Sequence, residues 1–258
     1  SSNAFAVAVP DVTFVMDTDA SMDGEGLERL HGVLRGAGLH LAQTQRSVAA
    51  LTTLNGGTVV RPMTPWSGAS DTDALIQASS AVDHDSDLDQ AVSGALGIAR
   101  EQAEVTANAG VVLVVTDGTR EVSANTLGAI RREGDEAVPV RVVGVGVGPA
   151  RGYADEALDA VTDESGGAYF YAPSRDAAEA ELAARFSALT QVAARNVKLD
   201  LRLPGSMKVV GVAGGNQAGT TTDVEDVVSG QNLGADSTMA FHIYLRVPVE
   251  EECPTIGI

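Results

Sequence analysis

Residues 12–23 read Val12-Thr-Phe-Val-Met-Asp17-Thr-Asp19-Ala-Ser21-Met22-Asp23, a run of strand formers that ends in two carboxylates and a hydroxyl at alternate positions. Because side chains alternate along an extended chain, Asp17, Asp19 and Ser21 lie on one side if the strand continues. A loop that curls into a following helix can also fold them around one ion, since hard oxygen atoms are ligands of Mg²⁺ and Ca²⁺. The stretch therefore predicts a cation site at the end of a strand.

The segments that follow this stretch predict one helix and a hairpin. Apolar residues recur at nearly helical spacing over residues 25–43, although three glycines weaken the helix propensity and leave packing to supply the difference. Residues 46–54 and 58–63 are rich in strand formers, and Asn55-Gly56 lies between them. Asn-Gly between two such runs is a strong hairpin signal, and Pro62 places the second strand at a sheet edge.

The rest of the first 195 residues alternates between helical and strand patterns. Helices are expected over residues 73–82, capped by Asp71 or Thr72, and over 88–105, 123–133, 153–165 and 175–194; strands are expected over 110–116, 138–144 and 168–171. This alternation predicts an α/β fold with a mostly parallel, doubly wound sheet. Ligands of such sheets bind beyond the carboxyl ends of the strands at the switch point. Asp17 and Asp117 both follow predicted strands, so they meet there if those strands are neighbours.

Three of these loops resemble those of the von Willebrand factor A (vWA) domain family: Asp17-Thr-Asp19-Ala-Ser21, Ser86-Asp87 at the start of a helix, and Thr116-Asp117-Gly118. The resemblance covers about residues 10–195. It implies a Rossmann-like, six-stranded sheet with one antiparallel edge strand and helices on both faces. It also implies a metal-ion-dependent adhesion site (MIDAS), in which Asp-x-Ser-x-Ser, a threonine and an aspartate from three loops hold a divalent cation.

Carried over residue by residue, the resemblance gives Asp17, Asp19, Ser21, Ser86 and Asp117 as metal ligands. Asp17, Ser21 and Asp117 match the family pattern, and Ser86 keeps the hydroxyl of the threonine. Asp19 departs from it, because the family has serine there. The resemblance implies Mg²⁺ as the ion, with Ca²⁺ or Mn²⁺ as alternatives, and a partner protein that offers an acidic side chain.

The additional carboxylate of Asp19 has opposing consequences. It partly neutralises the ion and repels an incoming carboxylate, so the site could hold metal more tightly while binding a partner more weakly. It could favour Ca²⁺, because sites with several carboxylates suit the larger ion. Alternatively the site is degenerate and holds no metal, with Asp19 hydrogen-bonded to loop amides. The sequence leaves these alternatives open.

Beyond residue 195 the pattern changes to β-type alternation without helices. Four regions are expected: a tag remnant and leader over 1–9, the vWA domain over 10–195, a small β module packed on that domain over 196–250, and a tail over 251–258. The stretch 226–247 resembles the β segment that follows the A domain in a group of bacterial proteins. That likeness implies a secreted or cell-envelope protein. Ser2-Asn3-Ala4 resembles an expression-tag scar, so a signal or anchor is expected to have been removed.

Composition excludes several classes of function. The formal net charge of −18 disfavours nucleic acid and anionic membrane surfaces as partners. No apolar run reaches the roughly 18 to 20 residues that cross a bilayer, so direct membrane insertion is not expected. The single cysteine, Cys253, excludes an intramolecular disulfide framework and a cysteine metal cluster. The expected partner is another protein, and the sequence does not indicate the oligomeric state.

A rival interpretation of the opening motif is a haloacid-dehalogenase-type phosphatase, in which Asp17 is the nucleophile and Asp19 the acid/base. That chemistry needs a lysine beside the phosphoryl group, and the only lysines are Lys198 and Lys208 in the β module. No Ser/His/Asp or Cys/His arrangement stands out. We therefore expect a protein that is not an enzyme.

Four further features are weaker candidates. Gly144-Val-Gly-Val-Gly148 lacks the third glycine of a dinucleotide-binding loop and predicts a strand end and turn. His84 is expected to be a solvated loop residue, with contact to a partner or metal as the alternative. Trp66 either anchors a partner or covers the sheet edge. The acidic run Asp83, Asp85, Asp87 and Asp89 is expected to be a solvated helix start favoured by the helix dipole.

Overall fold

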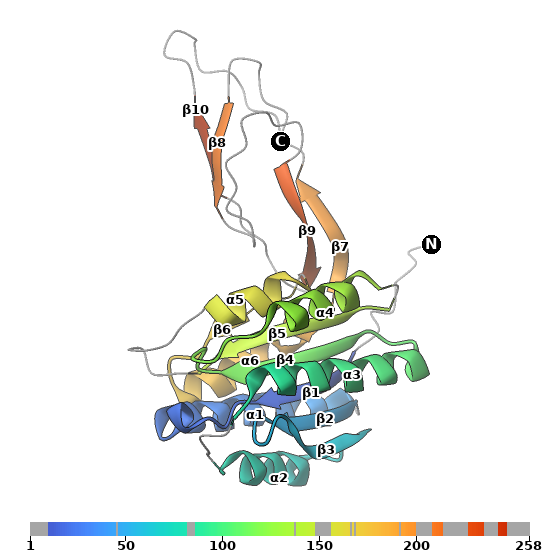
Figure 1. The fold of residues 1–258 in the computed structure, drawn as a ribbon, viewed down its shortest axis with the longest axis vertical. Coiled ribbons are helices and arrows are strands. Elements are labelled where there is room, and N and C mark those ends of the chain that lie inside the picture. Colours follow the sequence, from blue (N-terminus) through green and yellow to red (C-terminus); the bar gives the residue numbers. More distant parts are fainter. Residues whose placement is uncertain are drawn as a thin grey trace. The chain divides into compact units, whose positions relative to one another are not determined.

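The computed structural model describes residues 10–44, 46–81, 86–136, 138–147, 156–165, 167, 169–190, 192–199, 208–213, 227–234 and 242–246. The chain divides into two compact units, Ser1–Gln191 and Val192–Ile258. The first unit is an α/β domain built on one sheet (Figure 1). No helix in the described part of the chain combines the length and the apolar character needed to span a membrane.

The sheet of the first unit has six strands in the order β3-β2-β1-β4-β5-β6. The strands are β1 (Asp11–Met16), β2 (Ser47–Thr52), β3 (Thr58–Pro65), β4 (Gly110–Thr116), β5 (Val140–Gly146) and β6 (Tyr169–Tyr171). All neighbours are parallel except β2 and β3, so the sheet has one antiparallel edge strand. The predicted fold class is confirmed.

The predicted hairpin between β2 and β3 is also confirmed. Asn55, Gly56 and Gly57 have φ angles of 49°, 73° and 101°, a left-handed conformation that asparagine and glycine tolerate better than other residues. Pro62 lies in the edge strand, which has a neighbouring strand on one side only. The N–H that proline lacks is therefore not needed for a second strand pair. Trp66 directly follows β3 and is 6% exposed, with the Arg61 guanidinium 5.4 Å from its ring. Trp66 therefore covers the sheet edge.

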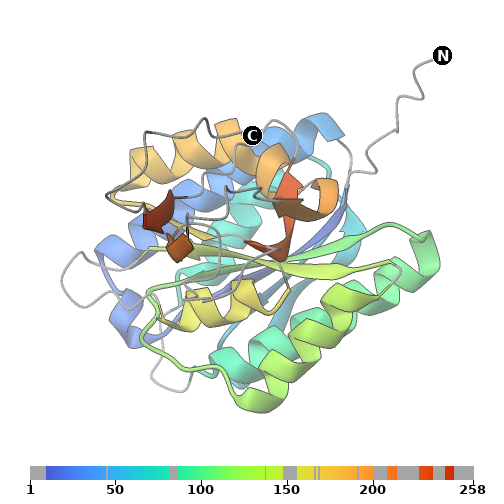
Figure 2. The same ribbon diagram turned by 90° about the horizontal axis from the view of Figure 1, so that it is seen from above.

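Helices lie on both faces of the sheet (Figure 2). The helices are α1 (Glu25–Thr44), α2 (Ala69–Ser79), α3 (Leu88–Thr106), α4 (Ala124–Asp135), α5 (Glu156–Asp163) and α6 (Arg175–Thr190), with a short 3₁₀ helix η1 (Ala20–Met22) before α1. One buried core joins α1, α2 and α6 to the sheet, and the other joins α3, α4 and α5 to the opposite face. The sheet strands β1, β2, β4 and β5 are almost entirely buried, as expected of a parallel sheet covered on both sides.

Two predicted helix boundaries were wrong. Helix α2 begins at Ala69 and its N-cap is Gly68, whereas Asp71, a predicted cap, accepts hydrogen bonds from the amide and hydroxyl of Ser67. Helix α6 ends at Thr190 and is followed by β7 (Val192–Leu199), so the predicted helix end at residue 194 was wrong.

The second unit contains β strands only among its described residues. Strand β7 pairs with β9 (Val227–Gly234), and β8 (Lys208–Ala213) pairs with β10 (His242–Arg246), both antiparallel. The predicted β character of this region is confirmed, although its first strand begins earlier than residue 197.

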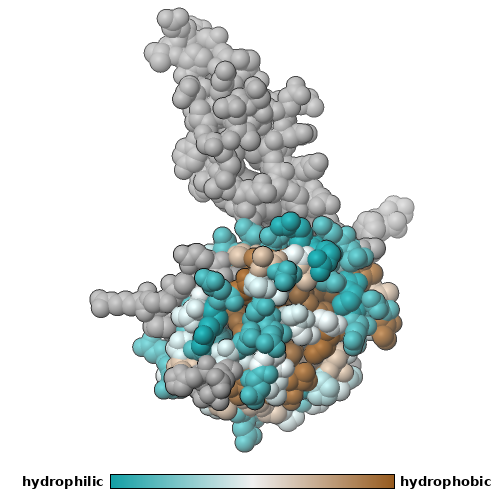
Figure 3. Space-filling view, in the orientation of Figure 1, coloured by the Kyte–Doolittle hydropathy of each residue, from teal (hydrophilic) through white to brown (hydrophobic). Residues whose placement is uncertain are grey.

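The described surface carries few large apolar side chains. Leu39, Val59 and Val105 are the exposed ones, at 57%, 49% and 83%, and they belong to three different elements. Figure 3 shows hydrophilic and hydrophobic residues interleaved over the face of the domain turned to the viewer. Single exposed apolar residues are normal on soluble proteins and do not define a docking patch.

Candidate metal centre at the sheet edge

The carboxyl ends of β1 and β4 lie side by side at the middle of the sheet. Strands β1 and β4 are parallel neighbours, and the Asp17 amide donates a hydrogen bond of 2.9 Å to the Val115 carbonyl. The chain runs outward from β1 to β2 and β3 on one side and returns to β4 on the other. Asp17 and Asp117 therefore stand at the topological switch point, where ligands of doubly wound sheets bind.

Asp17 is completely buried and its carboxylate holds the first loop together. Its Oδ1 accepts hydrogen bonds from the Asp19 amide (3.0 Å) and the Thr53 hydroxyl (3.3 Å), and its Oδ2 accepts one from the Thr116 hydroxyl (2.6 Å). Burial raises the pKa of the Asp17 carboxyl, and the nearby charges of Asp117 and Asp19 raise it too, against the lowering effect of the donated hydrogen bonds. An added positive charge nearby would therefore favour the ionised form of the Asp17 carboxyl.

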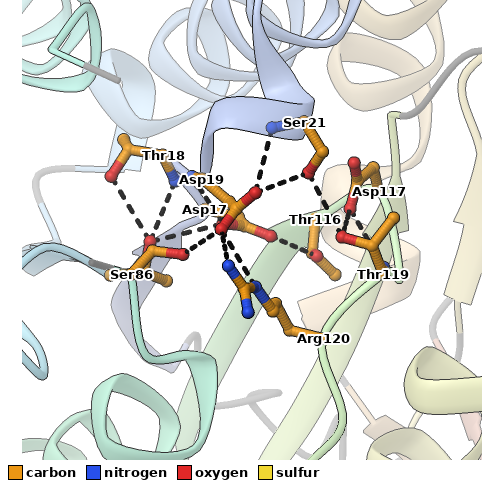
Figure 4. A network of polar contacts seen from close by, with 10 residues as sticks. Asp17, Thr18, Asp19, Ser21, Ser86, Thr116, Asp117, Thr119 and Arg120 are labelled. Atoms are coloured by element: carbon orange, nitrogen blue, oxygen red, sulfur yellow. Dashed lines mark hydrogen bonds and ion pairs between the residues drawn. The ribbon is translucent and has the colours of Figure 1, made fainter. Parts of the chain in front are cut away.

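Asp19 is the centre of the polar network (Figure 4). Its Oδ1 accepts hydrogen bonds from the amide and hydroxyl of Ser21, both at 2.9 Å, and its Oδ2 accepts one from the Ser86 hydroxyl at 2.7 Å. The Arg120 guanidinium forms an ion pair with the same Oδ2 through Nε (2.9 Å) and Nη2. Burial alone would raise the pKa of the Asp19 carboxyl, but the hydrogen bonds from Ser21, Ser86 and Arg120 hold it well below its ordinary value.

Asp117 belongs to a loop that reaches across to the first one. Its Oδ1 accepts hydrogen bonds from the amide (3.0 Å) and the hydroxyl (2.7 Å) of Thr119. The Thr119 hydroxyl lies 3.2 Å from the Ser21 hydroxyl, which links the first and third loops. Gly118 has a φ angle of 78°, so the tight turn between Asp117 and Thr119 uses a conformation that favours glycine.

Ser86 is brought to this edge by its contact with the end of β2. It pairs with Leu54 in an isolated bridge, and the Asp87 amide donates to the Thr53 carbonyl at 2.9 Å. Asp87 caps α3, since its side chain accepts a hydrogen bond from the Gln90 amide. Asp89 accepts hydrogen bonds from Ser123. Both charges therefore serve helix starts, while Asp83, His84 and Asp85 lie outside the described residues.

The five residues predicted as ligands offer hard oxygen donors of the type that Mg²⁺ and Ca²⁺ prefer. Within the described residues, no three histidine, cysteine or acidic side chains form a group that could hold an ion on its own. A cation here would have to use serine hydroxyls together with carboxylates. Three carboxylates, from Asp17, Asp19 and Asp117, face one guanidinium, from Arg120, so the charge balance also suits an added cation. In donor type and charge, the residues fit a divalent metal.

Four residues of this network were not predicted from the sequence. Thr53 and Thr116 hold Asp17, Thr119 holds Asp117, and Arg120 pairs with Asp19. The signal for Arg120 was available, because a carboxylate in place of a serine calls for a counter-charge and Arg120 stands three residues after Asp117. The threonines gave no such signal, since hydroxyl contacts depend on strand register.

Comparisons with known proteins agree on the fold. No protein-family model and no curated protein matches the sequence. Among solved structures, the chain is similar to a von Willebrand factor type A protein from Catenulispora acidiphila, with a TM-score of 0.61, 14% identity and 93% of this chain covered. The chain spans 58% of the length of that protein.

Two further structures are similar over about two thirds of the chain. An aerotolerance-related membrane protein from Bacteroides fragilis gives a TM-score of 0.51 at 14% identity, covering 67% of this chain and 96% of its own. The PilB minor pilin from Streptococcus sanguinis gives 0.52 at 10% identity, covering 69% and 60%. At such identities the likeness concerns the fold. Together with the sheet order and the position of the loops, it shows that this chain has the fold of a von Willebrand factor A domain.

Proposed function

We propose that this chain is a protein-binding module of the vWA type that has no catalytic activity. Its binding face is the set of loops at the carboxyl ends of β1 and β4, which we define as the loop face. The proposed divalent cation is held there by Asp17, Asp19, Ser21, Ser86 and Asp117. When bound, it supplies a positive centre that can accept an acidic side chain of the partner.

One observation carries this proposal: three segments far apart in the sequence bring their oxygen atoms into one network. Ser21 and Ser86 both donate to Asp19, although Ser86 is 67 residues away from it. The Ser21 hydroxyl reaches Thr119, which in turn donates to Asp117. Asp17 joins this network through the Asp19 amide, and it accepts further hydrogen bonds from Thr53, just after β2, and Thr116 in β4. Three carboxylates close together, from Asp17, Asp19 and Asp117, repel each other, so a loop with a purely structural role would not be expected to gather them.

Calorimetric titration with Mg²⁺, Ca²⁺ and Mn²⁺ tests the proposal. The parent protein should bind at least one of these ions at one site, and Asp117→Ala should abolish or strongly weaken the binding. Asp73→Ala is a matched control, because it removes the same charge from an exposed position on α2. Absence of binding by the parent, or equal binding by Asp117→Ala and the parent, would contradict the proposed metal site.

A second candidate is a scaffolding module of the same fold that works without metal. The ion pair between Arg120 and Asp19 favours it, because the guanidinium already supplies one positive charge at the position where the family motif has a serine. The same titration separates the two candidates, since a metal-free module shows no saturable heat with any of the three ions.

The proposal that the chain is not an enzyme has one direct structural support. As the nucleophile of a phosphatase, Asp17 would need room for a whole phosphoryl group in line with one of its oxygens, yet it is 0% exposed. Lys198 and Lys208 belong to the second unit. Measurable turnover of p-nitrophenyl phosphate that disappears in Asp17→Asn would overturn this part of the proposal.

We also propose that the protein acts outside the cytoplasm, in the bacterial cell envelope. Two similar folds belong to proteins described as an aerotolerance-related membrane protein and a minor pilin, and the stretch 226–247 resembles a segment of bacterial A-domain proteins. Fractionation of the source cells with a specific antibody tests this location. Recovery of the protein in the cytoplasmic fraction alone would contradict it.

A further inference from the structure

We infer that Arg120 is an internal counter-ion of Asp19 that a divalent cation must displace before Asp19 becomes a metal ligand. This inference rests on the proposed cation site and concerns a residue that the family motif does not include. On this view Arg120 sets the affinity of the site for cations, and the site alternates between an arginine-paired state and a metal-bound state.

The hydrogen bonds of Asp19 leave no acceptor for a metal. Its Oδ1 accepts from the amide and hydroxyl of Ser21, and its Oδ2 accepts from the Ser86 hydroxyl and from Nε and Nη2 of Arg120. A carboxylate offers about four lone-pair positions, and five donor atoms approach this one. A cation can therefore bind Asp19 only if a donor leaves.

Arg120 is the donor that can leave most easily. The Asp19 side chain is 7% exposed and is fixed in the loop, whereas the Arg120 side chain is 44% exposed. An arginine that swings away regains water around its guanidinium, and a half-exposed ion pair of this kind is generally weak. Ser21 donates through a backbone amide of the same loop, and both serine hydroxyls keep a lone pair that can face a metal while they donate to Asp19.

Arg120 also lies on the loop that carries a proposed metal ligand. Only Gly118 and Thr119 separate it from Asp117, and Thr119 is bonded to Asp117 through both its amide and its hydroxyl. If a cation binds Asp117 and Arg120 leaves Asp19, both changes therefore occur within residues 117–120. A guanidinium and a divalent cation near the same carboxylates also repel each other at short range.

The test compares Mg²⁺ affinity, by calorimetry, in the parent and in Arg120→Gln. The variant should bind Mg²⁺ about tenfold or more tightly, because the competing charge is gone and Asp19 is free to bind. Arg131→Gln is a matched control, because Arg131 on α4 forms an ion pair with Glu164, which directly follows α5 and is not part of the network. Arg120→Lys, which keeps the charge but not the paired N–H groups, should give an intermediate affinity and serves if Arg120→Gln folds poorly.

A second measurement follows the guanidinium itself. In ¹H–¹⁵N spectra of the parent protein, the Nε–H signal of Arg120, assigned by its loss in Arg120→Gln, should shift on titration with Mg²⁺ to the position of a solvated arginine. A signal that stays unchanged at saturating Mg²⁺ would overturn the inference.

The outcomes separate this inference from the proposed function. If the parent binds Mg²⁺ and Arg120→Gln binds it no more tightly than Arg131→Gln does, the inference fails while the metal site stands. If only Arg120→Gln binds, Arg120 keeps the cation out of the parent, so the inferred alternation between the two states and the metal site of the parent both fail. If neither protein binds, both fail.

Discussion

At the residue scale, two buried threonines of the central strands, Thr116 in β4 and Thr13 in β1, should contribute unequally to stability. The Thr116 hydroxyl donates to Oδ2 of Asp17 at 2.6 Å, so Thr116→Val leaves this buried carboxylate oxygen without its donor and should cost about 2 kcal/mol. Thr13 in the neighbouring strand is equally buried, but its hydroxyl has no hydrogen-bond partner among the described residues. Thr13→Val should be neutral or stabilise by about 1 kcal/mol. Urea unfolding measures both, and equal losses would contradict this assignment.

The residues of the candidate site could be predicted from the sequence, but their hydrogen-bond partners could not. Strand ends placed Asp17, Asp19, Ser21 and Asp117 at one sheet edge, the family resemblance added Ser86, and the structure brings the five together. Their hydrogen-bond partners depend on side-chain rotamers and on the register between β1, β2 and β4. Neither can be obtained from residue types alone, which is why Arg120 was missed.

At the element scale, the close packing of α1 against α6 explains the glycines that weaken the predicted helix. A Cβ atom added at Gly36 would lie 2.4 Å from the Glu179 carbonyl oxygen and 2.8 Å from the Leu182 Cβ. Gly36→Ala should therefore destabilise by about 1–3 kcal/mol despite its better helix propensity. Gly97 in α3 has no heavy atom within 4 Å of such a Cβ, so Gly97→Ala should stabilise by up to about 1 kcal/mol. Thermal unfolding of both variants should show opposite signs.

The starts of α3 and α4 are joined by Asp89, whose carboxylate accepts the Ser123 amide at 2.7 Å and the Ser123 hydroxyl at 3.0 Å. Although burial raises its pKa, hydrogen bonds from Ser123 and Thr126 lower the pKa of Asp89 below the ordinary 3.8. A carboxyl with a lowered folded-state pKa stabilises the protein above its unfolded pKa and loses this effect as the pH falls further.

Asp89→Ala should therefore cost about 1 kcal/mol at neutral pH, a value reduced for partial exposure. The difference from the parent should shrink as the pH falls below about 4. Chemical denaturation at pH 7 and pH 3 measures it. A difference that is constant with pH would show that the ionised carboxylate of Asp89 is not what joins the two helices.

Element types were largely predictable, and the errors have physical causes. Strand β1 was recognised from its run of strand formers, β4 from a continuous apolar run, and the β2–β3 hairpin from Asn55-Gly56. Helix α2 begins before its predicted cap: Asp71 lies inside the first turn and accepts hydrogen bonds from Ser67, just before the helix. Helix α6 ends before residue 194 because Val192 pairs with Gly234, a contact far away in the sequence.

At the scale of the whole molecule, the first unit should fold without the second. The sheet and both of its helical layers are complete at residue 191, so a chain of residues 1–191 should unfold cooperatively with native helix content. A chain of residues 1–174 lacks α6 and loses Ala178, Leu182 and Phe186 from the core, and should not fold. Circular dichroism during heating compares the two. Failure of residues 1–191 to unfold cooperatively would show that the first unit depends on the second.

The central claim is that the loop face of this vWA fold binds a divalent cation, and a crystal structure grown with Mn²⁺ tests it most directly through anomalous scattering. The predicted result is one anomalous peak within bonding distance of Ser21, Ser86 and a carboxylate of Asp19 or Asp117, with Arg120 turned away from Asp19. A structure at saturating Mn²⁺ that shows no peak at this edge, with Arg120 still paired with Asp19, would contradict the claim.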